Sequence, residues 1–265
     1  MNPIRLGVAG ATGRMGRALI RLAADDPAFV VVAAVTAADD PLLGRDAGSV
    51  AGIEPVHLNL GTETASPCDV LVEFTQAAGC VSWARWCAAG GVPLVSGTTG
   101  LDEAQQAALR AAAERVPIVW APNMSIGVNL MLAVAAELAA KLDPAWDIEI
   151  CETHHRHKTD APSGTARAFL EAVSAARGQP SDKLAVYGRA GSSGPRPAGQ
   201  IGVHAIRMGE IVGEHEVHFT SAAESLTLRH RAFSRDTFAA GALRAARWLV
   251  GKPPGLYTMR DVLTV

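Results

Sequence analysis

Several common features are scarce or missing in this 265-residue sequence. The four cysteines are Cys68, Cys80, Cys87 and Cys151, and they include no C-x-x-C pair and form no dense framework. This usage predicts reduced, mostly buried thiols in a cytosolic protein. Neither sign of charge dominates, because the net charge is −2. That balance argues against an electrostatic nucleic-acid binder, which needs a strongly basic face.

Long hydrophobic runs are also missing. No uncharged apolar run approaches the roughly 18 residues that suggest a membrane span, and the longest candidate, Ile126 to Ala140, contains Glu137. The N-terminus leads straight into a short strand-like run and has no signal-peptide pattern. Hydrophobic residues nevertheless make up 49% of the sequence and charged residues 19%, so a core can be buried in one large domain or two smaller ones.

A glycine-rich turn near the N-terminus predicts a dinucleotide-binding unit. The run Ile4–Ala9 reads as a short buried strand, and residues 17–24 have helical spacing. Between them the glycines follow G-x-x-G-x-x-G rather than the strict G-x-G-x-x-G. Gly10 would permit the tight turn, Gly13 the close approach of a pyrophosphate, and Gly16 the close packing of the helix. A glycine turn that serves only compactness is the alternative.

The second expected strand, Phe29–Val35, leaves the choice of nucleotide open. In dinucleotide-binding units an acid near the end of this strand contacts the adenosine ribose, and here Asp39 or Asp40 is the candidate. Arg14 in the glycine turn could instead reach a 2′-phosphate. The sequence is therefore compatible with NADH and with NADPH.

Strand-like and helix-like runs alternate up to about residue 125. Further strands are expected at 69–75, 92–96 and 117–120, with helices at 80–89 and 102–115. This alternation predicts an α/β fold with a Rossmann-type doubly wound parallel sheet. The carboxyl ends of the strands should line one crevice, at Gly10, Thr75, Gly97 and Ala121.

From residue 126 the pattern changes. A long helix is expected at 130–141, and three strand-like runs later follow one another without helices, at 201–208, 214–220 and 226–232. Such a succession predicts an α+β domain with a mixed or antiparallel sheet. We therefore expect a dinucleotide-binding domain at 1–125, rejoined by 234–265, and a second domain at 126–233.

The stretch Glu152–Thr165 concentrates chemically active side chains, with three histidines, a lysine and two carboxylates directly before an Ala-rich helix expected at 165–177. The first N–H groups of such a helix offer an anion site, so Gly164 and Thr165 could hold a carboxylate. Ser163 or Thr165 could add a hydroxyl. The stretch therefore predicts a site that combines titratable groups with an anion cradle.

The sequence resembles the dihydrodipicolinate reductase family. The blocks that carry the resemblance follow the family's order over essentially the whole chain, and they are 10–17, 97–100, 123–129, 152–165, 211–215 and 255–263. The resemblance implies a cytoplasmic enzyme, usually a homotetramer, that uses NADPH or NADH. It would reduce 4-hydroxy-tetrahydrodipicolinate, a cyclic dicarboxylate, to tetrahydrodipicolinate in the diaminopimelate route to lysine.

The resemblance also implies roles for single residues. His154 is the expected acid/base residue and Lys158 the expected proton donor, while His155, Gly164 and Thr165 would bind substrate. Residues 126–233 then become a substrate-binding and oligomerisation domain. The implied cofactor contacts are Gly10, Ala11, Thr12, Gly13, Arg14, Met15, Gly97, Thr98, Thr99, Ala121, Pro122, Asn123 and Met124, and no metal is implied.

Physical chemistry agrees with this interpretation and leaves two others open. Hydride addition to a conjugated imine leaves negative charge, so a proton must be delivered, and a histidine or lysine can deliver it. A metal-dependent hydrolase is the first alternative, with His155, His157 and Asp160 as zinc ligands. A nicotinamide-binding sensor without turnover is the second.

Overall fold

The computed structural model describes residues 2–64 and 67–265. The chain forms two compact units. Unit 1 contains residues 1–126 and 235–264, and unit 2 contains residues 127–234 and Val265. Each unit has its own hydrophobic core. Within the described residues, no helix is long and apolar enough to cross a membrane. The functional roles expected for the two domains stay predictions.

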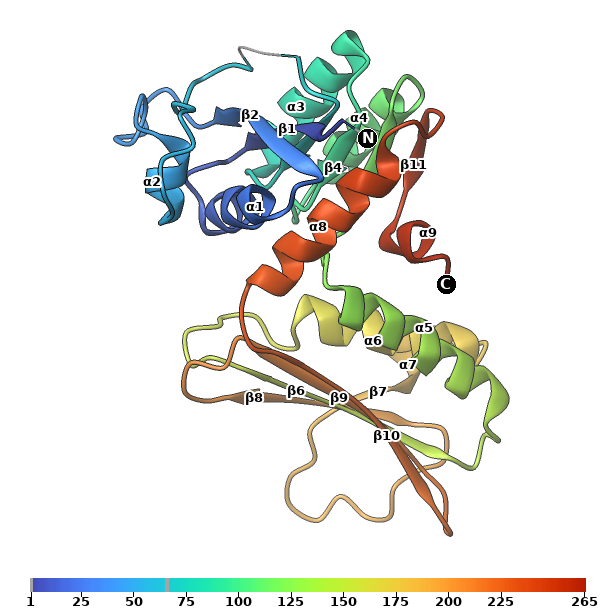
Figure 1. The fold of residues 1–265 in the computed structure, drawn as a ribbon. Helices are drawn as coiled ribbons and strands as arrows, with labels where there is room; N and C mark the ends of the chain where they lie inside the picture. Colours follow the sequence, from blue (N-terminus) through green and yellow to red (C-terminus); the bar gives the residue numbers. More distant parts are fainter. Residues whose placement is uncertain (1, 65–66) are drawn as a thin grey trace. The chain divides into compact units, whose positions relative to one another are not determined.

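Unit 1 is built on a six-stranded sheet in which all neighbouring strands are parallel (Figure 1). The strands are β1 (Ile4–Ala9), β2 (Phe29–Val35), β3 (Val70–Glu73), β4 (Leu94–Ser96), β5 (Pro117–Trp120) and β11 (Gly255–Tyr257). Their spatial order is β2-β1-β3-β4-β5-β11. The direction of winding reverses between β1 and β3, which is where sheets of this kind bind ligands.

Helices cover both faces of this sheet, which confirms the predicted doubly wound α/β fold. Helices α1, α8 and α9 pack into one core, and α3 and α4 pack into a second core with residues on the opposite face of the strands. The helices of unit 1 are α1 (Arg14–Asp25), α2 (Ala47–Ala51), α3 (Ala77–Gly90), α4 (Glu103–Ala113), α8 (Asp236–Leu249) and α9 (Met259–Leu263).

The start of α1 and the edge strand β11 differ from the expectation. Helix α1 begins at Arg14 rather than Arg17, because Gly13 is its extended N-cap and the first turn follows the glycine turn at once. The edge strand β11 was not predicted. It has three residues, too few for an alternation of buried and exposed positions to show in the sequence.

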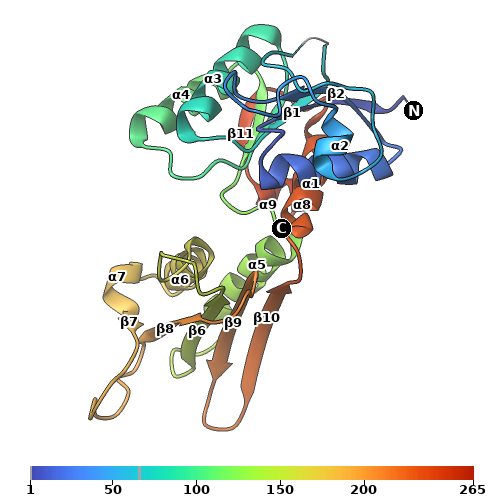
Figure 2. The ribbon, with the colours of Figure 1, turned by 90° about the vertical axis from the view of Figure 1, so that its left-hand side faces the viewer.

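Unit 2 combines a five-stranded mixed sheet with helices on one face (Figure 2). The strands are β6 (Asp147–His154), β7 (Ala185–Tyr187), β8 (Ile201–Arg207), β9 (Gly213–Thr220) and β10 (Ser225–Ala232), and the helices are α5 (Ile126–Lys141), α6 (Gly164–Ala176) and α7 (Ser181–Leu184). Strand β6 is parallel to β8 and antiparallel to β9, so the expected mixed sheet is confirmed. The short elements α7 and β7 were not predicted.

The four cysteines are free, and three of them are buried, in agreement with the sequence-based prediction. Burial, together with the nearby Glu73 carboxylate, raises the pKa of the Cys80 thiol to about 12. Burial also raises the pKa of Cys87. These thiols therefore stay protonated and act as small core residues.

Replacing Gly16 by alanine tests the packing of α1 against the glycine turn. A Cβ atom there would lie 2.2 Å from the carbonyl oxygen of Gly10 and 2.6 Å from Cα of Ala11, so the turn itself would have to move. Alanine is a better helix former than glycine by about 1 kcal/mol, but overpacking against backbone costs about 1–3 kcal/mol. We expect Gly16→Ala to lower the free energy of unfolding in chemical denaturation.

Gly90→Ala is the matched control, because Gly90 also belongs to a helix and a Cβ there meets only a Val92 methyl at 3.6 Å. This variant should be as stable as the wild type or slightly more stable. Equal stability of the two variants would show that the close approach of α1 to the glycine turn does not require a glycine at position 16.

Candidate functional site

The glycine turn after β1 has the geometry of an anion-binding loop. Gly10 lies in the left-handed region at φ +78°, and a Cβ there would lie 2.5 Å from the carbonyl oxygen of Phe74. At Gly13 an added Cβ would meet only the carbonyl oxygen of Gly10, at 3.2 Å, so the space beside the turn is otherwise open. The first N–H groups of α1 have no acceptor inside the helix and are therefore available to an anion.

A pocket of about 310 Å³ lies at this turn. It is lined by Arg14, Met15, Phe74, Gly97, Pro122, Asn123, Met124, Arg235 and Phe238. Residues that follow or end β1, β3, β4 and β5 are thus brought together at one place. Of the four residues expected there, only Gly97 is among the lining residues. Arg235 and Phe238, at the start of α8, were not predicted, because they lie more than 100 residues further along the chain than the other lining residues.

A buried network holds the loops after β3 and β4. The fully buried Glu73 carboxylate accepts hydrogen bonds from the Thr98 hydroxyl at 2.9 Å, the Thr75 hydroxyl at 2.7 Å and the Ser96 hydroxyl. Thr98 is 4% exposed, so its side chain supports the loop. Thr99 is exposed. Of these two predicted cofactor contacts, only Thr99 presents its side chain to solvent.

Asp40, one of the two candidate ribose-binding acids, is tied to the glycine turn. Its Oδ2 accepts hydrogen bonds from the hydroxyls of Thr12 and Thr36, both at 2.6 Å, and its Oδ1 accepts one from the Leu42 N–H at 2.8 Å. These bonds, that from Thr12 foremost, lower the pKa of Asp40. A carboxylate charge is therefore fixed beside the turn. Asp39 is exposed.

One end of the unit 2 core is polar. Strand β6 alternates between buried and less buried positions, and this period of two carries Glu152 and His154 onto its core-facing side. Arg207 on β8 pairs in register with His154, and His215 on β9 pairs with Glu152. The apolar face of the sheet therefore ends in a cluster of four titratable side chains.

Glu152 is fully buried and accepts four hydrogen bonds. Its Oε1 accepts from the Ser163 N–H at 3.0 Å and from Arg207 Nη2 at 2.8 Å. Its Oε2 accepts from His154 Nδ1 at 2.5 Å and from Arg207 Nη1 at 2.8 Å. Burial raises the pKa of Glu152, but the hydrogen bonds outweigh burial and lower it to about 2. The group is thus a carboxylate throughout the neutral range.

His154 is the last residue of β6. Its ring meets the ring of His215 edge to face, with centroids 5.1 Å apart. A side chain at Gly213 would start 3.1 Å from His154 Nε2, so this glycine leaves room for the ring. Burial and the charge of His154 lower the pKa of His215 to about 3, which keeps His215 neutral.

Lys158 lies in the loop after β6 and pairs with Asp160. Lys158 Nζ is 2.7 Å from Asp160 Oδ1, and this contact lowers the pKa of Asp160. Arg207 Nη2 donates to the carbonyl oxygen of Asp160 at 2.7 Å. The same arginine therefore contacts both Glu152 and the loop that carries Lys158.

The zinc cluster considered as an alternative is not assembled. Asp160 is engaged by Lys158, and the exposed His157 lies 3.4 Å from Glu210 instead. Over residues 2–64 and 67–265, no group of three or more histidine, cysteine, aspartate and glutamate side chains is arranged to hold a metal ion. The prediction of a hydrolase that uses His155, His157 and Asp160 is therefore wrong, because two of its three proposed ligands are paired with other residues.

The start of α6 follows this loop directly. Ser163 is the N-cap, and its hydroxyl accepts a hydrogen bond from the Ala166 N–H at 3.2 Å and lies 3.1 Å from His215 Nε2. The Ser163 hydroxyl is thus used within the protein and not available as the substrate ligand once expected. No heavy atom outside its chain neighbours lies within 4 Å of a Cβ built on Gly164. His155 Nδ1 is buried and has no hydrogen-bond partner among the described residues.

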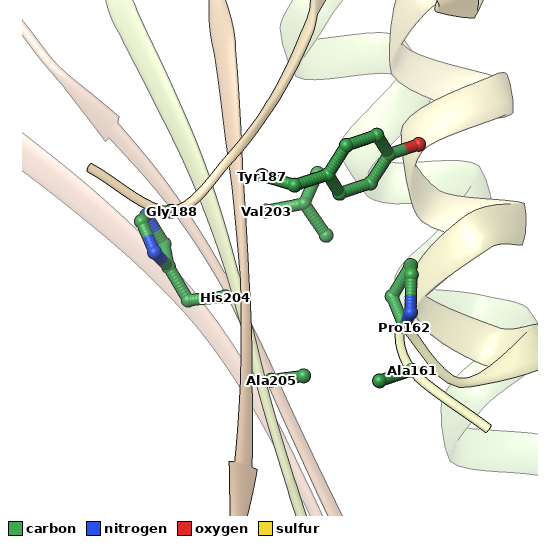
Figure 3. A pocket seen from close by; sticks show the side chains of 7 residues that line it. All are labelled: Ala161, Pro162, Tyr187, Gly188, Val203, His204 and Ala205. Carbon is green, nitrogen blue, oxygen red and sulfur yellow. The ribbon is translucent and has the colours of Figure 1, made fainter. Parts of the chain in front are cut away.

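A cavity of about 410 Å³ lies beside the loop before α6, and it is lined by Ala161, Pro162, Tyr187, Gly188, Val203, His204 and Ala205. Figure 3 shows Tyr187, Val203 and Ala205 on the side facing Ala161 and Pro162, whereas His204 points away from them. The cavity shares no lining residue with the cluster around Glu152. It therefore does not enlarge the predicted site.

Three participants in the unit 2 cluster were not assigned a role from the sequence: Glu152, Arg207 and His215. Glu152 and His215 lie in blocks that carry the family resemblance, and their alternation with buried apolar residues was a usable signal. Arg207 had no such signal. Its role depends on the register between β6 and β8, which are not consecutive in sequence.

The doubly wound unit with its glycine turn and the second unit with a histidine and lysine site define a two-domain, pyridine-nucleotide-type oxidoreductase. The chain belongs to the dihydrodipicolinate reductase family: the family's N-terminal domain matches residues 4–124 and its C-terminal domain matches residues 127–263.

Similar proteins cover the whole chain. The 4-hydroxy-tetrahydrodipicolinate reductase of Thiobacillus denitrificans is 48% identical over 262 residues, which are 98% of each chain. The enzyme of the same name from Rubrobacter xylanophilus is 48% identical over 261 residues, again 98% of each chain. A dipicolinate-bound dihydrodipicolinate reductase from Paenisporosarcina sp. TG-14 has the same fold, with a TM-score of 0.77, 23% identity and 98% coverage of both chains.

The depressed pKa of Glu152 predicts a pH dependence of stability. The folded value of about 2 lies below the ordinary value of 4.5, so the carboxylate stabilises the fold above pH 4.5, and this contribution is lost as the pH falls toward 2. This shift in the pKa of Glu152 corresponds to a contribution of roughly 3 kcal/mol at most to the free energy of unfolding. We expect wild-type protein to lose more unfolding free energy than Glu152→Gln between about pH 5 and pH 3, measured by urea denaturation.

Glu171→Gln is the control, because Glu171 is an exposed residue of α6 in the same unit. Its acid destabilisation should match that of the wild type. Identical pH slopes for the wild type and Glu152→Gln would contradict the assignment of a stabilising, ionised carboxylate.

Proposed function

We propose that the chain is a cytoplasmic 4-hydroxy-tetrahydrodipicolinate reductase, which uses a reduced pyridine nucleotide to form tetrahydrodipicolinate in the diaminopimelate route to lysine. The observation that carries the proposal is the 48% identity, over nearly the full length, with relatives of that name. The four free cysteines agree with a reducing compartment.

The nucleotide is proposed to bind at the glycine turn of unit 1. A side chain at Gly13 would occupy the open space beside the turn, and the N-terminus of α1 supplies N–H groups for the pyrophosphate. Thr12, Arg14 and Met15 continue the turn. The remaining contacts are proposed to come from Gly10, Ala11, Gly97, Thr98, Thr99, Ala121, Pro122, Asn123 and Met124, many of which line one pocket. Bound there, the reduced nicotinamide supplies a hydride.

The substrate is proposed to bind at the start of α6. Its carboxylates carry negative charge, which the N-terminal end of a helix attracts. Gly164 and Thr165 begin the first turn of α6. The buried Nδ1 of His155, which has no hydrogen-bond partner in the part of the chain that the structure describes, lies in the preceding loop. We assign carboxylate binding to these three residues.

The proton is proposed to come from His154 or Lys158. The 4-hydroxyl group of the substrate must leave as water to give a conjugated imine. Hydride addition to this imine creates a basic atom, and a general acid nearby raises the rate by about 10²–10⁴-fold. His154 is 12% exposed and Lys158 is 21% exposed, so both side chains are reachable yet partly withdrawn from water. We assign acid/base exchange to His154 and proton donation to Lys158.

Self-association as a homotetramer completes the proposal. Helices cover only one face of the unit 2 sheet (Figure 2), and the other face carries pairs such as Glu149 with His204 and Glu216 with Arg229. Glu149, His204 and Glu216 are partly exposed, whereas Arg229 is 57% exposed. A face of this kind can be covered by further copies of the chain.

An assay with Lys158 replaced tests the function and the donor together. Purified wild-type protein should oxidise NADH or NADPH only when freshly generated 4-hydroxy-tetrahydrodipicolinate is present, followed by the loss of reduced-nicotinamide absorbance. Lys158→Ala should lower kcat by about 100-fold or more, because a general acid is lost. Nucleotide affinity should change less than about twofold.

Lys183→Ala is the control, since Lys183 is an exposed lysine of α7 in the same unit. Its turnover should equal that of the wild type. No nucleotide oxidation by the wild type would refute the proposed function, whereas full turnover by Lys158→Ala would remove only the role of the lysine.

The fixed charge of Asp40 predicts how nucleotide preference responds to substitution. The 2′-phosphate of NADPH is repelled by a carboxylate beside the glycine turn, and an effect of about 1 kcal/mol is reasonable for such a solvent-accessible pair. We expect Asp40→Asn to raise the ratio of kcat/KM for NADPH over NADH about fivefold, and Arg14→Ala to lower it. An unchanged ratio in both variants would show that Asp40 and Arg14 do not determine the preference between NADPH and NADH.

A further inference from the structure

We infer that Glu152 and Arg207 are positioning residues that fix the His154 ring and the Lys158 loop for proton delivery. Neither residue is assigned a role by the family resemblance. The inference rests on the proposed function, because it concerns how the two proposed proton-handling residues are held. It arises from one connected set of contacts within unit 2.

Glu152 cannot itself exchange a proton with a substrate. Its two oxygens accept four hydrogen bonds, from the Ser163 N–H, His154 Nδ1 and both terminal nitrogens of Arg207. A carboxylate offers about four lone-pair directions, and all of them are used here. Its side chain is fully buried as well. The group can therefore act only through the residues that it contacts.

The bond to Glu152 selects the working atom of His154. Nδ1 of His154 lies 2.5 Å from Oε2 of Glu152. An ionised carboxylate can only accept a hydrogen bond, so Nδ1 must carry the hydrogen. The other ring nitrogen, Nε2, forms no hydrogen bond within residues 2–64 and 67–265. It points toward the position where Gly213 lacks a side chain, 3.1 Å from the Cβ that would stand there. Nε2 is thus the atom left to exchange a proton.

Arg207 connects this histidine to the lysine loop. Nη1 and Nη2 form a fork on Glu152, each at 2.8 Å, and Nη2 also donates to the carbonyl oxygen of Asp160 at 2.7 Å. The carboxylate of Asp160 in turn holds Lys158 Nζ at 2.7 Å. A single guanidinium therefore fixes the distance between the His154 ring and the backbone of the Lys158 loop.

Stability alone is a weak reason for such an arrangement. Replacing a buried ion pair by apolar side chains of similar size is often neutral or stabilising, whereas removing one partner is strongly destabilising. The same strand position could have continued the apolar face of β6. The presence of Glu152 and Arg207 here is explained by their contacts, which fix one tautomer of His154 and the position of the Lys158 loop.

The same strand supplies a matched comparison. Glu149 on β6 also contacts a histidine, with His204 Nε2 at 2.6 Å, and also pairs with an arginine, with Arg196 Nε at 3.1 Å. Glu149 and Glu152 are separated by an odd number of positions, so their side chains leave opposite faces of the strand. Glu149 holds neither His154 nor the Lys158 loop. Glu149→Gln keeps the shape of the side chain and removes its charge, so it is the control for Glu152→Gln.

The test uses Glu152→Gln, Arg207→Met and the double variant, in the full chain and with the assay described above. Each single change should lower kcat about 10–100-fold, as loss of the group that orients a reactive histidine does. KM values for nucleotide and substrate, and the affinity for dipicolinate as a probe, should stay within about threefold. In the double variant the unpaired buried charge is gone, so thermal stability should recover while kcat remains low.

Three outcomes would overturn the inference. Recovery of kcat together with stability in the double variant would make the pair merely structural. A raised KM with unchanged kcat would make Arg207 a substrate ligand. A loss of kcat in Glu149→Gln equal to that in Glu152→Gln would show that any charge change in β6 has this effect.

A conservative variant decides the question if the neutral variants do not fold. Arg207→Lys keeps the charge but lacks the fork that binds Glu152 and Asp160 together. It should fold and show reduced kcat with nearly unchanged KM, and wild-type kcat in it would contradict the inference. Failure of the proposed function is distinguishable, because wild-type protein would then oxidise no nucleotide at all.

Discussion

The burial of a charged Glu152 at the end of an apolar sheet face is the constraint on which the unit 2 site depends. Moving an unpaired carboxylate out of water is very unfavourable, so the fold must bring donors to it. Those donors come from β6 itself, from β8 and from the loop before α6. The positions of three separate segments are therefore coupled through one side chain.

The two units reach their functions by different physical means. At the glycine turn of unit 1 the ligand-facing groups are backbone N–H groups, and the requirement on the sequence is the absence of side chains, as at Gly10. In unit 2 the proposed proton-handling groups, His154 and Lys158, are side chains, and each is held by another side chain. Substitutions near the turn act through steric collisions, whereas substitutions in unit 2 act through unpaired charges and lost hydrogen bonds.

Much of the fold was predictable because its signals are local. The glycine turn, the alternation of strands and helices in unit 1 and the run of strands in unit 2 all show in short windows of sequence. The short elements β7, β11 and α7 were missed because three or four residues display no period. Nearly all expected site residues lie in continuous blocks of sequence, so the resemblance could assign them expected roles.

The supporting residues of the site were not predictable in the same way. Arg207 lies 55 residues from Glu152, and only the parallel pairing of β6 with β8 brings them together. The spacing of His155, His157 and Asp160 looked suitable for zinc, but the strand ends before them and each side chain follows its own loop geometry. Spacing predicts a metal site only where a regular element fixes the directions of the side chains.

The division of the chain has a consequence for biosynthesis on the ribosome. Unit 2 is, apart from Val265, one continuous segment, whereas unit 1 needs α8, α9 and β11 from the end of the chain. Helix α8 packs against α1, and β11 extends the sheet beside β5. The nascent N-terminal segment must therefore wait, with part of its apolar surface uncovered, until about 130 further residues have emerged, at roughly 5–20 residues per second. Unit 2 can complete its own core during that interval.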